Sequence, residues 1–269
     1  MPYRVEVAQD DDLPELMKVL WLSFEQPYQG ILRNFFPILN NDREASLIKA
    51  TNGQREEYKS SYPELIWLKV LQYSDNTAEE ELEDGKGQRG GEKHMSQIVG
   101  GAKWYFFQRN PFVPQPGSDH DPATEEAVWY PEGVGRTFAT AAMHALDLPR
   151  MRMAQKPHSF LNIAFTLPEH RRKGVANLFL KWGLAHADQL GLDSWLDAFE
   201  LGVPVYAKMG FIAYGLNKIS PVMPPEYTSE QKLEWEWMEK EILPMDSVTM
   251  WRPAGGKFVN GEMVTPWAS

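Results

Sequence analysis

The sequence has no cysteine and no long hydrophobic run, and both absences exclude whole classes of chemistry. Without cysteine there are no thiol nucleophiles, disulfide bonds or thiolate metal ligands, which fits a reducing intracellular setting. No apolar stretch approaches the roughly 18 residues of a membrane span, and the opening MPYRVEV lacks the apolar region of a secretory signal. We therefore expect a cytoplasmic protein, with a nuclear location left open, and no membrane partner.

The sequence has fewer basic than acidic residues, 27 Lys and Arg against 37 Asp and Glu, which gives a formal net charge of −10. Bulk binding of nucleic acid rests on neutralising phosphates, so no nucleic-acid partner is expected. The basic residues at 170–173 then serve a local purpose. The net negative field has two explanations, a means of solubility or an attraction for a cationic small molecule.

The pattern of apolar residues predicts a sheet with helices between its strands. Alternating or continuous apolar residues predict strands, and apolar residues at helical spacing predict helices. The predicted strands are 3–8, 65–71, 98–107, 160–167, 194–198, 211–216 and 247–252. The predicted helices are 12–24, 44–59, 134–148, 175–190, 203–209 and 228–243, with a short one within 27–41. This mixed order is typical of an α/β or α+β sheet domain, here a single domain over 1–269.

Residues 74–96 differ from the rest of the chain, because they are charged, rich in glycine and almost without apolar side chains. Such a segment cannot bury enough surface to offset the entropy of ordering it, so we predict a flexible acidic insertion. The alternative is an acidic arm that docks a partner protein.

The stretch from Ser159 to Leu190 carries the clearest chemistry. An apolar strand meets Pro168, then a basic turn, then a long amphipathic helix. A helix N-terminus with free N–H groups and nearby cations is a site for a polyanion. Residues 171–176 (RRKGVA) fit the pattern Arg/Gln-x-x-Gly-x-Gly/Ala, in which Gly174 lets a phosphate approach the backbone. Taken alone, the pattern also fits a solvated basic turn.

A second motif at residues 204–211 (PVYAKMGF) follows at a matching spacing. Together the two motifs resemble the Gcn5-related N-acetyltransferase family, in its fungal small-molecule-like form, over residues 159–212. The resemblance implies a twisted, mostly antiparallel sheet flanked by helices and splayed open between the strands at 160–167 and 194–198. It also implies that acetyl-coenzyme A, the cosubstrate, lies in that splay, and that acetyl passes directly to an amine within a ternary complex.

The same resemblance places the cosubstrate on one strand and the turn after it. Backbone groups around Phe165 and Leu167 would pair with the pantetheine arm, and a strand amide near 165 would stabilise the oxyanion. The amides of residues 171–176 would hold the pyrophosphate. The implied cosubstrate-binding residues are Phe165, Thr166, Leu167, Arg171, Arg172, Lys173, Gly174, Val175 and Ala176.

Three residues are catalytic candidates. Tyr206 stands where the family commonly places a proton donor to the departing thiolate, with a core tyrosine as the alternative. Asp197, on a strand that flanks the splay, is a candidate base, or else a residue that points to solvent or caps a turn. Glu132, beside two aromatic residues, is a candidate for the acceptor pocket. Asn162 stands where some relatives carry an acid, and an amide cannot act as a base. The histidines lack metal-ligand spacing, so no metal is expected.

The acceptor is the open part of the prediction. Our leading hypothesis is an acetyltransferase that acts on a primary amine of a small molecule. One alternative is a non-catalytic acyl-coenzyme A-binding or regulatory module that keeps the cleft and lacks the base. Another is a protein acetyltransferase that docks through residues 74–93. The sequence is compatible with a monomer and with a homodimer.

Overall fold

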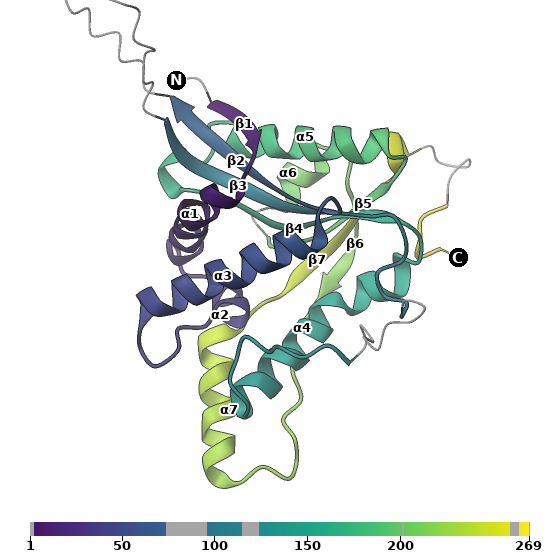
Figure 1. Ribbon diagram of the computed structural model, residues 1–269. Helices are drawn as coiled ribbons and strands as arrows, with labels where there is room; N and C mark the ends of the chain where they lie inside the picture. Colours follow the sequence, from purple (N-terminus) through teal and green to yellow (C-terminus); the bar gives the residue numbers. More distant parts are fainter. Residues whose placement is uncertain (1–2, 74–95, 115–123, 201, 259–263, 269) are drawn as a thin grey trace, which may run out of the picture.

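One seven-stranded sheet runs through the computed structural model, which describes residues 3–73, 96–114, 124–200, 202–258 and 264–268 (Figure 1). Its strands are β1 (Tyr3–Val7), β2 (Leu65–Tyr73), β3 (Ser96–Phe107), β4 (His158–Thr166), β5 (Asp193–Ala198), β6 (Ile212–Asn217) and β7 (Ser247–Arg252), in the order β1-β2-β3-β4-β5-β7-β6. Every neighbouring pair is antiparallel except β4 and β5. The predicted mixed, mostly antiparallel sheet is therefore confirmed. The predicted insertion at 74–96 lies, apart from its last residue, outside the described residues.

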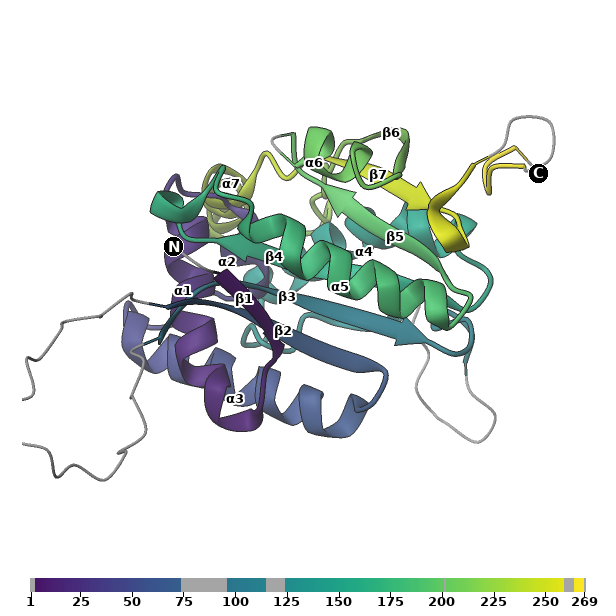
Figure 2. The ribbon, with the colours of Figure 1, turned by 90° about the horizontal axis from the view of Figure 1, so that it is seen from above.

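Helices cover both faces of this sheet. The larger set comprises α1 (Leu13–Glu25), α2 (Ile31–Phe35), α3 (Arg43–Ser61), α4 (Val134–Met153) and α7 (Ser229–Ile242). On the other face, α5 (Val175–Gln189) runs across β1 to β5, and α6 (Val203–Ala207) packs into the same core (Figure 2). Among the residues that the structure describes, no helix combines the length and the hydropathy that a membrane span requires.

One glycine lets α5 lie close to the centre of the sheet. A Cβ at Gly183 would come within 2.2 Å of a ring carbon of Trp104, which is fully buried on β3. Glycine inside a helix costs roughly 0.5–1 kcal/mol relative to alanine. The close packing of the indole against the helix backbone offsets that cost. This contact packs the middle of α5 closely against β3.

The predicted elements agree closely with the observed ones, and α4 shows the clearest difference. The sequence predicts an end at 148, before Pro149, whereas the helix continues to Met153. Proline inside a helix removes one hydrogen bond and crowds the preceding turn. The last turn persists because Arg150 is buried, pairs with Asp147 one turn earlier and packs over the ring of Phe160.

Candidate active site

The sheet opens between its two parallel strands. β4 and β5 are paired only as far as Leu161 and Leu196. Asn162 comes next, and the pairing of β3 with β4 skips it, which makes Asn162 the extra residue of a β-bulge. A bulge bends its strand, so from Ile163 to Thr166 β4 is paired with β3 alone. The predicted splay is confirmed, and the bulge is its local cause.

The backbone of β4 offers hydrogen-bonding groups to this splay. The amide of Leu167 donates to the carbonyl of Val99, 2.9 Å away, at the end of the ladder with β3. Along an antiparallel strand, every second residue directs its backbone N–H and C=O to the same neighbouring strand, so the backbone groups of Phe165 also face β3. The backbone groups of Ala164 and Thr166 therefore face the other way, into the gap between β4 and β5. Thr166 is among the residues that the sequence predicted for the cosubstrate, whereas Ala164 is not, and the carbonyl of Thr166 accepts from Arg171.

The turn between β4 and α5 presents a run of unpaired amides. From Arg172 to Ala176, no backbone N–H meets an acceptor in the described part of the chain. Gly174, at φ +84°, and Arg172, at φ +60°, are both in the left-handed region. The other described non-glycine residues there are Asn40 and Asn41, and asparagine tolerates this conformation. At Arg172 it costs roughly 1–2 kcal/mol, and such local strain with converging amides is typical of an anion-binding nest.

The basic side chains of this turn have two different tasks. Arg171 donates from Nε to the carbonyl of Thr166 at 3.2 Å and from Nη2 to the carbonyl of Ser23 at 2.6 Å. Its guanidinium thus fastens the turn to β4 and α1. Arg172 and Lys173 are exposed and form no ion pair with any described residue. They remain available to an anion at the amides, where charge-assisted hydrogen bonds are strong.

A pocket of about 130 Å³ lies in the splay beside this turn. Its lining comes from β4, α5 and α6 and consists of Ala164, Phe165, Thr166, Ala176, Phe179, Gly202, Val205 and Tyr206. The ring of Tyr206 lies over Gly202, where a Cβ would approach it to 2.7 Å. Burial raises the pKa of Tyr206 to about 12. Its hydroxyl is therefore protonated at neutral pH and can serve as a proton donor.

Asp197 lies where β5 leaves β4, on the opposite face of the sheet from Tyr206. Alternation along β5 places Leu196 in the core with α5 and α6, and Asp197 on the α4 side. The Oδ1 atom accepts a hydrogen bond from Thr249 at 2.7 Å, and the buried Oδ2 has no partner among the described residues. Burial raises the pKa of Asp197 to about 7, against the opposing effects of Arg150 and Thr249. Such a pKa suits a general base at neutral pH.

The other polar candidates lie outside the pocket lining. The side chain of Glu132, before α4, is 91% exposed and faces Arg136 at 3.7 Å. Asn162 is exposed at the bulge although it belongs to a central strand, so a molecule from solvent can reach β4 there. In the described part of the chain, no group of three or more His, Asp or Glu side chains could hold a metal ion.

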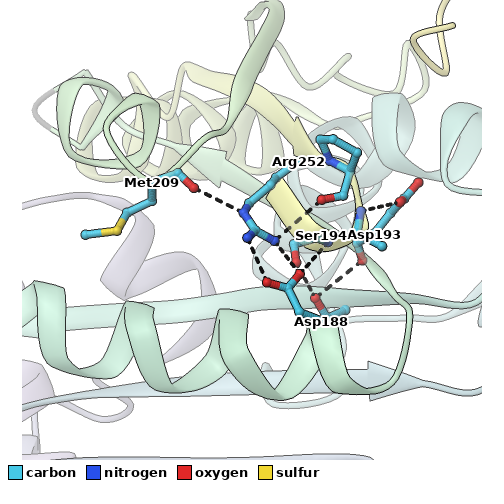
Figure 3. Close-up of polar contacts among 9 residues, drawn as sticks. Asp188, Asp193, Ser194, Met209 and Arg252 are labelled. Carbon is cyan, nitrogen blue, oxygen red and sulfur yellow. Dashed lines mark hydrogen bonds and ion pairs between the residues drawn. The ribbon is translucent and has the colours of Figure 1, made fainter. Parts of the chain in front are cut away.

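The far end of α5 is closed by Arg252 (Figure 3). From the end of β7, its guanidinium donates to both oxygens of Asp188 at 2.8 and 2.9 Å and to the carbonyl of Met209 at 3.1 Å. Asp188 also accepts from the amide of Gly255 at 2.7 Å. The hydrogen bonds from Arg252 hold the pKa of Asp188 below its usual value. This Arg252 cluster ties α5 and the end of α6 to β7, and so fixes two of the elements that line the pocket.

Three contributors to the site went unpredicted from the sequence. Ala164 faces the splay because of the bulge, which only the register of β3 with β4 reveals. Thr249 and Arg150 reach Asp197 from elements that are distant along the chain. No local pattern of residue types marks either of them.

No family model and no curated relative matches the chain. Among solved structures, it is similar to an acetyltransferase of Corynebacterium glutamicum described with histone acetyltransferase HPA2 (16% identity, 97% of this chain and 99% of that one, TM-score 0.48). It is also similar to the PaiA N-acetyltransferase of Thermoplasma acidophilum in complex with coenzyme A (11%, 94% and 99%, TM-score 0.45). A third likeness is to Naa20 of Chaetomium thermophilum with a bisubstrate analogue (15%, 94% and 87%, TM-score 0.41). With scores this low, the fold class rests on the sheet itself, and the family and its fungal small-molecule form stay predictions.

Proposed function

We propose that this chain is an acetyl-coenzyme A-dependent N-acetyltransferase that acetylates a primary amine of a small molecule. The observation that carries the proposal is the adjacency of three features: the open amides from Arg172 to Ala176, the splay, and the pocket beside Tyr206. A pyrophosphate binds at a helix N-terminus, and an extended amide-containing arm pairs with a free strand edge. The donor needs both features, and its thioester needs the pocket between them.

The residues present fit this donor. The amides of residues 172–176, with the side chains of Arg172 and Lys173, would hold the pyrophosphate. A Cβ at Gly174 would meet no atom within 4 Å, so the approach to these amides is open. The backbone groups of Ala164 and the amide of Thr166 would pair with the pantetheine arm, since the carbonyl of Thr166 already accepts from Arg171. When bound, acetyl-coenzyme A supplies an acetyl group activated as a thioester.

Three groups of the chain accept a proton, stabilise the developing negative charge and donate a proton, respectively. Asp197 takes the proton of the attacking amine, directly or through one water molecule. The open backbone amides of β4, at Ala164 and Thr166, donate to the oxygen on which negative charge develops. Tyr206 donates a proton to the departing sulfur. Because Tyr206 and Asp197 lie on opposite faces of the sheet, the donor enters from the α5 side and the acceptor from the α4 side.

Two properties of the acceptor side favour a small amine. The Oδ2 atom of Asp197 is buried on the α4 side of the sheet, so a compact acceptor reaches it best. The net charge of −10 draws cationic amines toward the protein. An amine must lose its proton before it attacks, and a carboxylate with a raised pKa is matched to that step.

Release of free thiol from acetyl-coenzyme A across a panel of primary amines, with a peptide set alongside, tests the proposal. We expect thiol release that depends on a small amine, and calorimetric binding of coenzyme A. Absence of coenzyme A binding would refute the proposal. Binding without turnover over the whole panel would favour the non-catalytic acyl-coenzyme A-binding module, and turnover with peptides alone would favour a protein acetyltransferase.

A further inference from the structure

Arg150, in the last turn of α4, is buried although its side chain is charged. Its Nη2 donates to Asp147 at 2.7 Å, and its Nε is buried without a partner among the described residues. The guanidinium carbon lies 3.6 Å from the ring centroid of Phe160 and 4.8 Å from that of Phe112. A buried cation that is only partly hydrogen-bonded is costly, so its retention calls for a physical reason.

The surroundings of Arg150 connect it to Asp197. Phe160, under the guanidinium, pairs across the sheet with Trp195 on β5. Trp195 and Asp197 share one face of β5, because side chains alternate along a strand. Neither the buried Oδ2 atom of Asp197 nor the buried Nε atom of Arg150 has a hydrogen-bond partner in the part of the chain that the structure describes. An unsatisfied donor and an unsatisfied acceptor of opposite charge therefore lie in one layer, between α4 and the sheet.

Among the described residues, the charges that act on Asp197 do not come from the strands around it. β7 contributes the hydroxyl of Thr249. β4 contributes His158, whose pKa is lowered to about 4 by burial, so its imidazole is neutral. The next carboxylate on β5 is Asp193, at the other end of the strand, where the indole of Trp251 donates to it.

The charges that act on Asp197 come from α4. The positive charge of Arg150 lowers the pKa of Asp197, and the negative charge of Asp147 raises it. A nearby cation favours the ionised form of a carboxyl group, and a nearby anion disfavours it. The ion pair between Arg150 and Asp147 thus contains two opposing influences on one carboxylate.

We propose, resting on the transfer function proposed above, that Arg150 is a positioning residue for the reaction. Its guanidinium favours the ionised form of the Asp197 carboxylate, which can then accept the proton of the amine, and the charge of Asp147 has the opposite effect on the same carboxylate. Arg150 acts through Asp197 and does not touch the substrates.

Titration of the Asp197 carboxyl carbon by NMR, in protein labelled with [4-¹³C]aspartate, tests this without any substrate. Asp197→Asn identifies the signal. Arg150→Met removes the charge and keeps a long side chain over Phe160, and it should raise the pKa of Asp197 by about half a unit or more. Asp147→Asn removes a negative charge and should lower the same pKa.

Two further variants separate charge from packing. Arg150→Lys keeps the positive charge and should return the titration of Asp197 close to that of the wild type. Arg152→Met removes an exposed arginine from the same helix and is the matched control, with no expected shift. A purely structural role for the ion pair would not move the pKa in opposite directions in Arg150→Met and Asp147→Asn.

The pH profile of kcat/KM gives a second readout. Asp197 must be ionised to act as a base, so activity rises with pH through its pKa. This acid limb should move to higher pH in Arg150→Met and to lower pH in Asp147→Asn. An Asp197 pKa that is the same in the wild type and both variants would overturn the inference, even in an active enzyme.

A failure to fold and an absence of transferase activity have different consequences for this inference. If Arg150→Met does not fold, Asp147→Asn decides alone, and an unchanged or raised pKa of Asp197 contradicts the inference. If the NMR shifts occur as expected in a protein without transferase activity, the effect of Arg150 on Asp197 stands while the proposed function fails.

Discussion

The two ends of α5 are built in opposite ways. At its N-terminus, the amides from Arg172 to Ala176 meet no acceptor in the part of the chain that the structure describes, and exposed cations stand beside them. At its C-terminus, Asp188 and Arg252 form two mutual hydrogen bonds and each has a further backbone partner (Figure 3). Both ends carry charge. The two ends differ in whether the protein itself completes the hydrogen bonds, and the end that it leaves open is the candidate binding site.

The segment 202–209, which contains the short helix α6, connects the pocket with the closed end. Its first turn brings Gly202 and Tyr206 to the pocket, and the carbonyl of Met209, just after it, accepts from Arg252. The hydrogen bonds of the closed end therefore hold α6 in the position in which Tyr206 lines the pocket. Variants at each end should separate stability from binding.

Removing Arg252 from the closed end should have the largest effect of these variants, a loss in the free energy of unfolding. Arg252→Met leaves Asp188 and the carbonyl of Met209 without their partner, and breaking a buried ion pair costs roughly 3–5 kcal/mol. Because the side chain of Asp188 is 30% exposed, we expect a loss in the free energy of unfolding of about 3 kcal/mol. Urea unfolding measures it, with Lys181→Ala on the exposed face of α5 as the control. A loss no larger than that of Lys181→Ala would show that the cluster does not hold the fold together.

The unfolding free energies of the wild type and Arg252→Met should differ less in acid than at neutral pH. Arg252 lowers the pKa of Asp188, so the contribution of the cluster is present at neutral pH and is lost as the pH falls through the folded-state pKa. The unfolding free energies of the wild type and Arg252→Met should therefore converge as the solution is acidified. A difference that stays constant over the acid range would contradict the ionic account.

Blocking the open end should abolish donor binding, with a loss of stability similar to that of its control variant. Gly174→Glu places a carboxylate in front of the amides, and we expect at least about a 100-fold loss in coenzyme A affinity, or roughly 2.7 kcal/mol. The matched control is Gly191→Glu at the other end of the helix, because its φ of +68° resembles the +84° of Gly174 and neither Cβ would meet an atom within 4 Å. Both variants carry similar backbone strain. Calorimetry showing equal losses of affinity would contradict an anion site at residues 172–176.

Tyr206→Phe tests the part of α6 that faces the pocket. A thiol has an ordinary pKa near 8.5, so its thiolate is already a fair leaving group. The expected fall in kcat is therefore moderate, about ten- to a hundredfold, or roughly 1.4–2.7 kcal/mol. The affinity for coenzyme A and the unfolding free energy should stay close to those of the wild type. Tyr214→Phe, at an exposed tyrosine on β6, is the control, and an unchanged kcat in Tyr206→Phe would remove this hydroxyl from the mechanism.

The contrast between the two ends also explains what the sequence could predict. The open end consists of neighbouring residues, so the pattern at 171–176 and the apolar strand before it were enough to predict a strand, a basic turn and a helix N-terminus there. The closed end joins residues 188, 209 and 252, which no local pattern connects. The same holds for Asp197, whose position on β5 was predictable, whereas its contacts with Thr249 and Arg150 depend on tertiary packing. The strands and helices were predictable because each carries its own periodicity, and the bulge at Asn162 was not, because it is a property of pairing.

The smallest expected effect is a loss of coenzyme A affinity in Lys173→Ala, which distinguishes the contribution of the cations at the open end from that of its amides. Lys173→Ala removes an exposed charge near the N-terminus of α5, where such a charge contributes roughly 0.3–1 kcal/mol, so coenzyme A affinity should fall about two- to fivefold. The loss should shrink at high salt, because exposed charges are screened. Lys181→Ala removes the same charge two turns further along α5 and should leave affinity unchanged. Equal, salt-sensitive losses in both variants would mean that the general field of the helix attracts the donor, and the amides alone would then distinguish the open end from the closed one.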